Sequence, residues 1–154
     1  MKSQTSVTRK SDREIVVSRT IDAAPRIVFE AWTKAELFKR WWVPKSFPIS
    51  LLSCEMDVRV GGKYSLVFGA EPQPIEFFGK YLEVVPCSRL VWTNEEGGEE
   101  AAAITTVTFE ERDGKTLLTM SDLHPSKEAL DASGATDATA EVWDQLEELV
   151  VTLH

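Results

Sequence analysis

The sequence is poor in the residues that most often hold metals or form disulfides. It contains two cysteines and two histidines among 154 residues. Cys54 and Cys87 lie far apart and match neither the CxxC spacing of a redox pair nor the spacing of a zinc site, so both are expected to be reduced structural residues. The phosphate-binding patterns GxGxxG and GxxxxGK[ST] are also missing. The sequence therefore predicts no metal and no cofactor.

Basic residues and long apolar runs are scarce as well. The 17 lysines and arginines are outnumbered by 25 aspartates and glutamates, which gives a net charge of −8. This charge repels a phosphate backbone, and no basic run is interleaved with aromatic residues, so no nucleic acid is expected as a partner. No apolar run approaches the length of a membrane span, and the first residues are too polar for a signal peptide. We expect a cytoplasmic protein without membrane insertion.

What the chain does contain is the length and pattern of one globular domain. With 43% hydrophobic residues, it can bury a single core. We expect a polar N-terminal leader over residues 1–12 and one domain over 13–154. Glu14–Ile21 alternates apolar and polar residues with the period of a half-buried strand. Pro25 suits a helix start, and Thr33 with Glu36 resembles a capping box, so two short helices are predicted after this strand.

The remainder reads as a series of strands followed by a helix. Turn residues divide the region from about Ile49 to Met120 into about six short strands, and Asp113-Gly114 is its strongest hairpin signal. After Gly134, apolar residues recur at helical spacing as far as Leu153 and predict a long amphipathic helix. Strands and helices do not alternate, which excludes a parallel doubly wound sheet. The predicted fold is α+β: a curved antiparallel sheet of six to seven strands wrapped on the C-terminal helix.

An ordered set of motifs carries a resemblance to a known family. The motifs are Val28-Phe29-x-Ala31-Trp32-Thr33, Trp41-Trp42-x-Pro44, Cys54-Glu55-Met56-Asp57-x-Arg59-x-Gly61-Gly62, Gly79-x-Tyr81-x-Glu83-x-x-Pro86, Arg89-Leu90-Val91-Trp92-Thr93-Asn94 and Thr106-Val107-Thr108-Phe109. Over about residues 13–153 the chain resembles the START-like (SRPBCC) superfamily, in the bacterial branch related to the C-terminal domain of the activator of the heat-shock ninety ATPase. The resemblance implies the helix-grip fold and a cavity. Because the superfamily includes lipid binders, polyketide cyclases and a co-chaperone domain, it does not say what the cavity holds.

Three functional hypotheses follow from these features. The first is a small-molecule binding protein that holds a hydrophobic or aromatic metabolite, with or without one acidic group, between the sheet and the C-terminal helix. The first alternative is a cyclase- or dehydratase-like enzyme that uses the same cavity. The second alternative is a co-chaperone-like interaction module that uses its surface, with the acidic loop near Glu99 as a docking patch. A homodimer is compatible with the sequence, which does not fix the oligomeric state.

Large side chains on the elements that should face the cavity are the candidate ligand contacts. They are Trp41, Trp42, Phe47, Tyr64, Phe78, Trp92, Met120 and Trp143. Phe78 and Leu82 are expected on the inward face of their strand. For the tryptophans the alternative is simple core packing, because large aromatic side chains are primarily core material.

Three polar residues are the candidates for catalysis. Asp57 and Arg59 alternate with apolar neighbours, and they either form a solvated ion pair on the outer face or point inward. If they point inward, Arg59 would bind a carboxylate or enolate oxygen and Asp57 would hold the guanidinium in place. His124 could reach the cavity mouth as a general base, or it could be a loop histidine that caps backbone groups.

Overall fold

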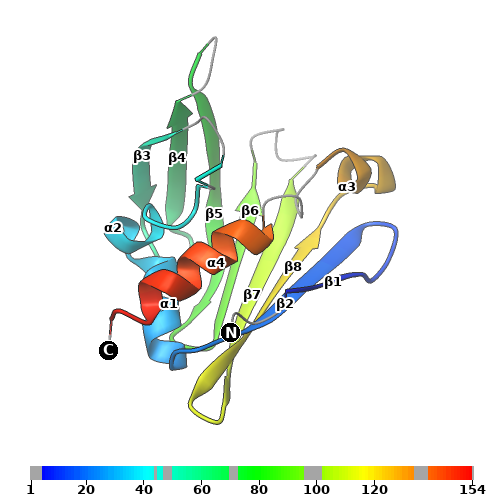
Figure 1. The fold of residues 1–154 in the computed structure, drawn as a ribbon. Coiled ribbons are helices and arrows are strands. Elements are labelled where there is room, and N and C mark those ends of the chain that lie inside the picture. Colours follow the sequence, from blue (N-terminus) through cyan, green and yellow to red (C-terminus); the bar gives the residue numbers. More distant parts are fainter. Residues whose placement is uncertain are drawn as a thin grey trace.

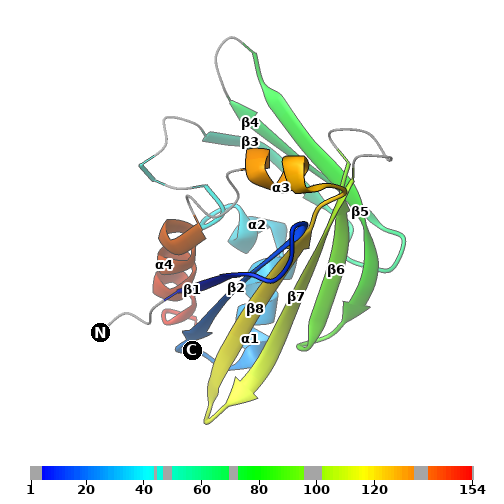
Figure 2. The same ribbon diagram turned by 90° about the vertical axis from the view of Figure 1, so that its right-hand side faces the viewer.

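One antiparallel sheet curves around helices on its concave side (Figure 1; Figure 2). The computed structural model describes residues 5–43, 45–46, 50–69, 73–95, 102–133 and 139–153. The elements are β1 (Ser6–Arg9), β2 (Glu14–Ile21), α1 (Pro25–Thr33), α2 (Ala35–Phe38), β3 (Ser50–Met56), β4 (Lys63–Gly69), β5 (Ile75–Val85), β6 (Arg89–Asn94), β7 (Ala103–Arg112), β8 (Lys115–Leu123), α3 (Lys127–Ser133) and α4 (Thr139–Val150). The strands lie in the order β1-β2-β8-β7-β6-β5-β4-β3.

The predicted fold class is confirmed, with one strand more than expected. Strands β3 to β8 fill the region that turn residues divide, and β2 matches the predicted first strand. The turn between β7 and β8 is Asp113-Gly114, whose φ angles of 54° and 81° suit a primed hairpin turn. The additional strand, β1, lies inside the predicted leader and pairs with β2. All of its side chains are exposed, so it has no apolar pattern by which the sequence could predict it.

The start of α2 differs from the prediction. Lys34 is the N-cap of α2, and no side chain caps this helix. Thr33 is instead the last residue of α1, and its hydroxyl donates to the carbonyl oxygen of Phe29 at 2.9 Å. The predicted capping box of Thr33 with Glu36 is therefore wrong, because the Thr33 hydroxyl bonds back within its own helix. The two short helices themselves are confirmed.

Helix α4 is attached to the sheet by apolar packing and by a buried charge. Its fully buried side chains are Trp143, Leu146 and Val150. Arg19 of β2 is only 2% exposed. Its Nη1 donates to Asp144 Oδ1 at 2.7 Å and its Nη2 donates to Glu147 Oε1 at 2.6 Å. These two ion pairs join α4 to the strand on which Arg19 lies.

The same helix also fixes the segment that follows α2. The side chain of Gln145 donates to the carbonyl oxygens of Trp41 and Val43 at 3.0 and 2.9 Å, and its Oε1 accepts from the Lys45 N–H at 2.9 Å. Gln145 is 8% exposed, so these bonds are shielded from water. The segment carries Trp42, and α4 therefore determines where that indole lies.

Strand β5 changes its partner halfway along its length. Residues 75–80 pair with β4, and from Tyr81 onward the strand pairs with β6. A register shift between Tyr81 and Glu83 marks a bulge, which bends a strand. Gly79 permits the close approach of β5 to β6, because a Cβ at this position would lie 1.9 Å from the carbonyl oxygen of Thr93 on β6. We call this bend of the sheet the β5 corner.

Candidate ligand-binding site

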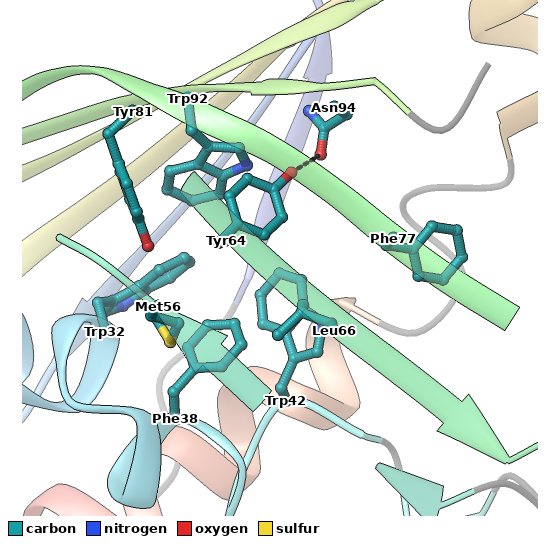
Figure 3. Close-up of a pocket in the computed structure, with 10 residues that line it drawn as sticks. All are labelled: Trp32, Phe38, Trp42, Met56, Tyr64, Leu66, Phe77, Tyr81, Trp92 and Asn94. Atoms are coloured by element: carbon teal, nitrogen blue, oxygen red, sulfur yellow. Dashed lines mark hydrogen bonds between the residues drawn. The ribbon is translucent and has the colours of Figure 1, made fainter. Parts of the chain in front are cut away.

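A cavity of about 230 Å³ lies at the β5 corner (Figure 3). Helices α1 and α2 and the segment after them form one side, and β3, β4, β5 and β6 form the other. The lining residues are Trp32, Phe38, Trp42, Met56, Tyr64, Leu66, Phe77, Tyr81, Trp92 and Asn94. No described residue of α4 is among them. The cavity expected between the sheet and the C-terminal helix lies instead between the sheet corner and the two short helices.

Trp32 is at the centre of the aromatic wall. Its ring centroid lies 4.8 Å from that of Trp41, 6.0 Å from that of Trp42 and 5.9 Å from that of Trp92. Phe38 stacks on Trp42 with 4.6 Å between the centroids. Ring pairs at these separations stabilise one another beyond the apolar area that they bury. The wall is therefore held in place by its own ring contacts.

Some polar groups at the cavity have hydrogen-bond partners and others have none within the described ranges. The Tyr64 hydroxyl donates to the carbonyl oxygen of Thr93 at 2.7 Å and lies 3.3 Å from Asn94 Oδ1. Tyr81 is 4% exposed, and within the described ranges its hydroxyl has no hydrogen-bond partner. Trp32 Nε1 is fully buried and also has no partner there. In Figure 3 the Tyr81 hydroxyl points toward Trp32 and away from Asn94.

A chain of hydrogen bonds runs from Asn94 across the neighbouring strands. Asn94 Nδ2 donates to Thr105 Oγ1 at 2.9 Å, and the Thr105 hydroxyl donates to Asp122 Oδ1 at 2.5 Å. Burial raises the pKa of the Asp122 carboxyl, although the bond from Thr105 and the nearby His124 lower it. Because Thr105 gives its one hydroxyl proton to Asp122, it accepts from Asn94. This fixes the Asn94 amide with its oxygen toward Tyr64.

The structure brings together only part of the predicted contact set. The members that line the cavity are Trp42, Tyr64 and Trp92. Trp41 and Trp143 are fully buried, and Met120 is 8% exposed. These three side chains pack in the hydrophobic core and not against the cavity, as large side chains often do. Phe47 lies outside the described residues.

The inward face of β5 is shifted by one residue from the prediction. Phe77 lines the cavity, and Tyr81 is buried on the same face. Phe78 and Leu82 do not line the cavity, and Phe78 borders a second pocket together with Ser65 and Glu76. The expectation for Phe78 and Leu82 is therefore wrong. Consecutive phenylalanines show no alternation, and the close approach at Gly79 sets the register instead.

None of the three polar candidates lines the cavity. Arg59 Nε donates to Asp57 Oδ2 at 2.8 Å, and their side chains are 76% and 54% exposed. They form a solvated ion pair in the turn that follows β3, which ends at Met56, so the inward alternative is wrong. His124 follows β8, where its backbone N–H donates to the carbonyl oxygen of Arg13 at 2.7 Å and its Nε2 is buried without a partner among the described residues.

Most of the lining residues were missed by the sequence reasoning. They are Trp32, Phe38, Met56, Leu66, Phe77, Tyr81 and Asn94. Trp32, Met56, Tyr81 and Asn94 all stand inside the motifs that carry the family resemblance. A signal was thus present for these four, but nothing in the sequence says which side chains of a motif face the same hollow.

Neither a metal centre nor a membrane-spanning helix is present in the described ranges. No group of three or more histidine, cysteine, aspartate or glutamate residues in them could hold a metal ion. None of their helices is both long enough and apolar enough to cross a bilayer. Cys54 and Cys87 are free thiols, and burial raises the pKa of Cys54 although Lys39 lowers it.

The curved sheet, the C-terminal helix and the cavity between sheet and helices define a START-like protein. Residues 22–151 match the family described as Activator of Hsp90 ATPase homolog 1-like protein. The chain belongs to this family. No curated protein matches the sequence.

Solved structures from bacteria share the fold over nearly the whole chain. A Rhodobacter sphaeroides protein is 19% identical with a TM-score of 0.86, covering 98% of this chain and 100% of that one. A Chromobacterium violaceum protein is 27% identical with a TM-score of 0.76, covering 91% and 98%. An AHSA1-like protein from Aeromonas hydrophila is 17% identical with a TM-score of 0.71, covering 90% and 93%. These likenesses describe the fold.

Proposed function

We propose that this protein binds a small hydrophobic or aromatic molecule in the cavity at the β5 corner. The observation that carries the proposal is the hollow of about 230 Å³ with an aromatic wall. Apolar hollows with a few placed polar groups are the usual form of small-molecule sites. The volume lies below the roughly 300–1,000 Å³ of sites for drug-sized ligands, so the ligand has one or two rings. Family membership supports the proposal, because START-like proteins commonly hold hydrophobic ligands.

The two alternative functions have weaker support. A cyclase- or dehydratase-like reaction would need polar side chains in the cavity, and Asp57 and Arg59 instead pair with each other in the exposed turn after β3. A co-chaperone-like surface was expected in the acidic loop near Glu99, which lies outside the described residues. The proposal therefore includes binding alone and no reaction step.

The proposal is tested by filling the cavity. Met56 is half-buried on β3 and lines the hollow, so Met56→Phe places a ring where the ligand would lie. Small aromatic compounds should raise the Tm of the unaltered protein by roughly 5–10 °C at one hundred times their Kd. The same compounds should raise the Tm of Met56→Phe by much less. Differential scanning fluorimetry with an external dye gives both numbers.

Leu52→Phe is the matched control for this experiment. Leu52 lies on the same strand but is 60% exposed and does not line the cavity, so this variant adds the same ring elsewhere. It should respond to ligand as the unaltered protein does. The proposal fails if no one- or two-ring compound raises the Tm, or if both variants lose the response equally.

A further inference from the structure

Two hydrogen-bond donors at the cavity wall are left without acceptors. The Tyr81 hydroxyl has no hydrogen-bond partner within the described ranges and, unlike Trp32 Nε1, is not fully buried, so it borders the open space of the cavity; Trp32 Nε1 is fully buried there without a partner. Donors that are shielded from bulk water and have no acceptor in the protein are rare in folded proteins. Figure 3 shows the Tyr81 hydroxyl directed toward Trp32 inside the ring of lining residues. An acceptor atom of a bound molecule would satisfy this hydroxyl.

The charge around the cavity limits what that acceptor can be. None of the lining residues carries a charge at neutral pH. Burial raises the pKa of Tyr81, and Cys54 and Asp57 raise it further, so the phenol remains a donor. The whole chain has a net charge of −8. A carboxylate in this hollow would lose its hydration without gaining a cationic partner, which is strongly unfavourable.

We propose that the cavity selects a neutral molecule of one or two rings that carries an oxygen able to accept a hydrogen bond, and that Tyr81 Oη donates to that oxygen. The inference rests on the proposed function and adds the chemical class of the ligand. It decides against the acidic group that the sequence left open for the ligand, for which an inward Arg59 would have been the partner. Tyr81 becomes the residue that determines specificity.

Three probes with the same bicyclic ring system test the proposal. They are indane, which has no oxygen, 1-indanone, which has a neutral carbonyl oxygen, and indane-2-carboxylate, which is an anion. The unaltered protein should bind 1-indanone roughly tenfold more tightly than indane, as expected for one buried hydrogen bond. Indane-2-carboxylate should bind more weakly than indane. Ligand-observed NMR titrations measure all three Kd values.

Tyr81→Phe removes the hydroxyl and keeps the ring, so it distinguishes their contributions to binding. This variant should bind indane as the unaltered protein does and lose the preference for 1-indanone. Tyr64→Phe is the matched control, because the Tyr64 hydroxyl already donates to Thr93, and the ratio of the two Kd values should stay the same whatever happens to each. The circular dichroism spectrum and the Tm verify that each variant folds.

The outcomes distinguish this inference from the function on which it rests. If none of the three probes binds, the binding function and the ligand class both fail. If indane and 1-indanone bind equally well, or if Tyr81→Phe keeps the tenfold preference, the cavity stands and the role of Tyr81 is refuted. Tighter binding of the carboxylate than of 1-indanone would refute the neutral class.

Discussion

At the scale of single residues, Gly79 at the β5 corner has very little room for a side chain. A Cβ at this position would lie 1.9 Å from the carbonyl oxygen of Thr93, and a backbone atom cannot move aside as a side chain can. Gly79→Ala should therefore lower the free energy of unfolding by about 1–3 kcal/mol or more, in the range of overpacking substitutions. Urea denaturation followed by circular dichroism measures the loss.

Gly69→Ala on the adjoining strand is the control for this substitution. A Cβ there meets only side-chain atoms, Ser50 Oγ at 3.3 Å and Leu52 carbons at 3.4 Å, which can adjust. Its effect should stay within about 0.5 kcal/mol, as for most substitutions away from special features. Equal stability of the two alanine variants would show that the corner does not need a glycine.

Single residues also show how far the sequence alone could predict this protein. Hairpin chemistry identified the Asp113-Gly114 turn, and the alternation in β2 identified a half-buried strand, because both signals are local. Which of Phe77 and Phe78 faces the cavity could not be predicted from the neighbouring residues. It depends on where β5 leaves β4 and approaches β6. The fold was therefore predictable, while the cavity depended on a bend that no short pattern encodes.

At the scale of elements, the attachment of α4 to β2 depends on one buried guanidinium. Arg19→Met removes the cationic partner from Glu147, whose side chain is 14% exposed, and from Asp144, whose side chain is 36% exposed. Removing one partner of a buried ion pair costs about 3–5 kcal/mol, and the exposure of Asp144 places the expected loss near the lower end. Chemical denaturation gives the value.

A second substitution tests whether charge or packing is responsible. The double variant Arg19→Met, Glu147→Leu replaces the closer ion pair by apolar side chains, which is often neutral or stabilising. It should recover most of the stability that Arg19→Met loses. No recovery would show that the loss does not come from an unpaired Glu147 carboxylate, and a loss below about 1 kcal/mol in the single variant would mean that apolar packing alone attaches α4.

At the scale of the whole molecule, Asp122 makes stability depend on pH. Burial raises the pKa of its carboxyl in the folded state above the ordinary value of about 3.9. Between these two pKa values the folded state binds more protons than the unfolded state, so the contribution of Asp122 falls as pH rises. Above the raised pKa the full cost of the buried charge is present.

Asp122→Asn removes this titration and keeps an oxygen to accept from Thr105. The variant should be more stable than the unaltered protein at pH 7, and the difference should shrink toward zero as pH falls to about 4. Urea denaturation at a series of pH values between 4 and 8 measures the difference, in which the other titrating groups cancel. If the difference in the free energy of unfolding between the two proteins stayed constant over this pH range, the pKa of Asp122 would not be raised in the folded state.

The separation between the helix that completes the core and the corner that holds the cavity has an evolutionary consequence. Trp143 and Leu146 are fully buried on α4, whereas the hollow is lined from α1, α2 and β3 to β6. Apart from Trp42, whose segment is bonded to Gln145, residues at the corner can thus be replaced without touching the buried face of the last helix. Proteins of this architecture can therefore differ at the corner while keeping the sheet and the last helix, and the solved bacterial structures share this fold at only 17–27% identity.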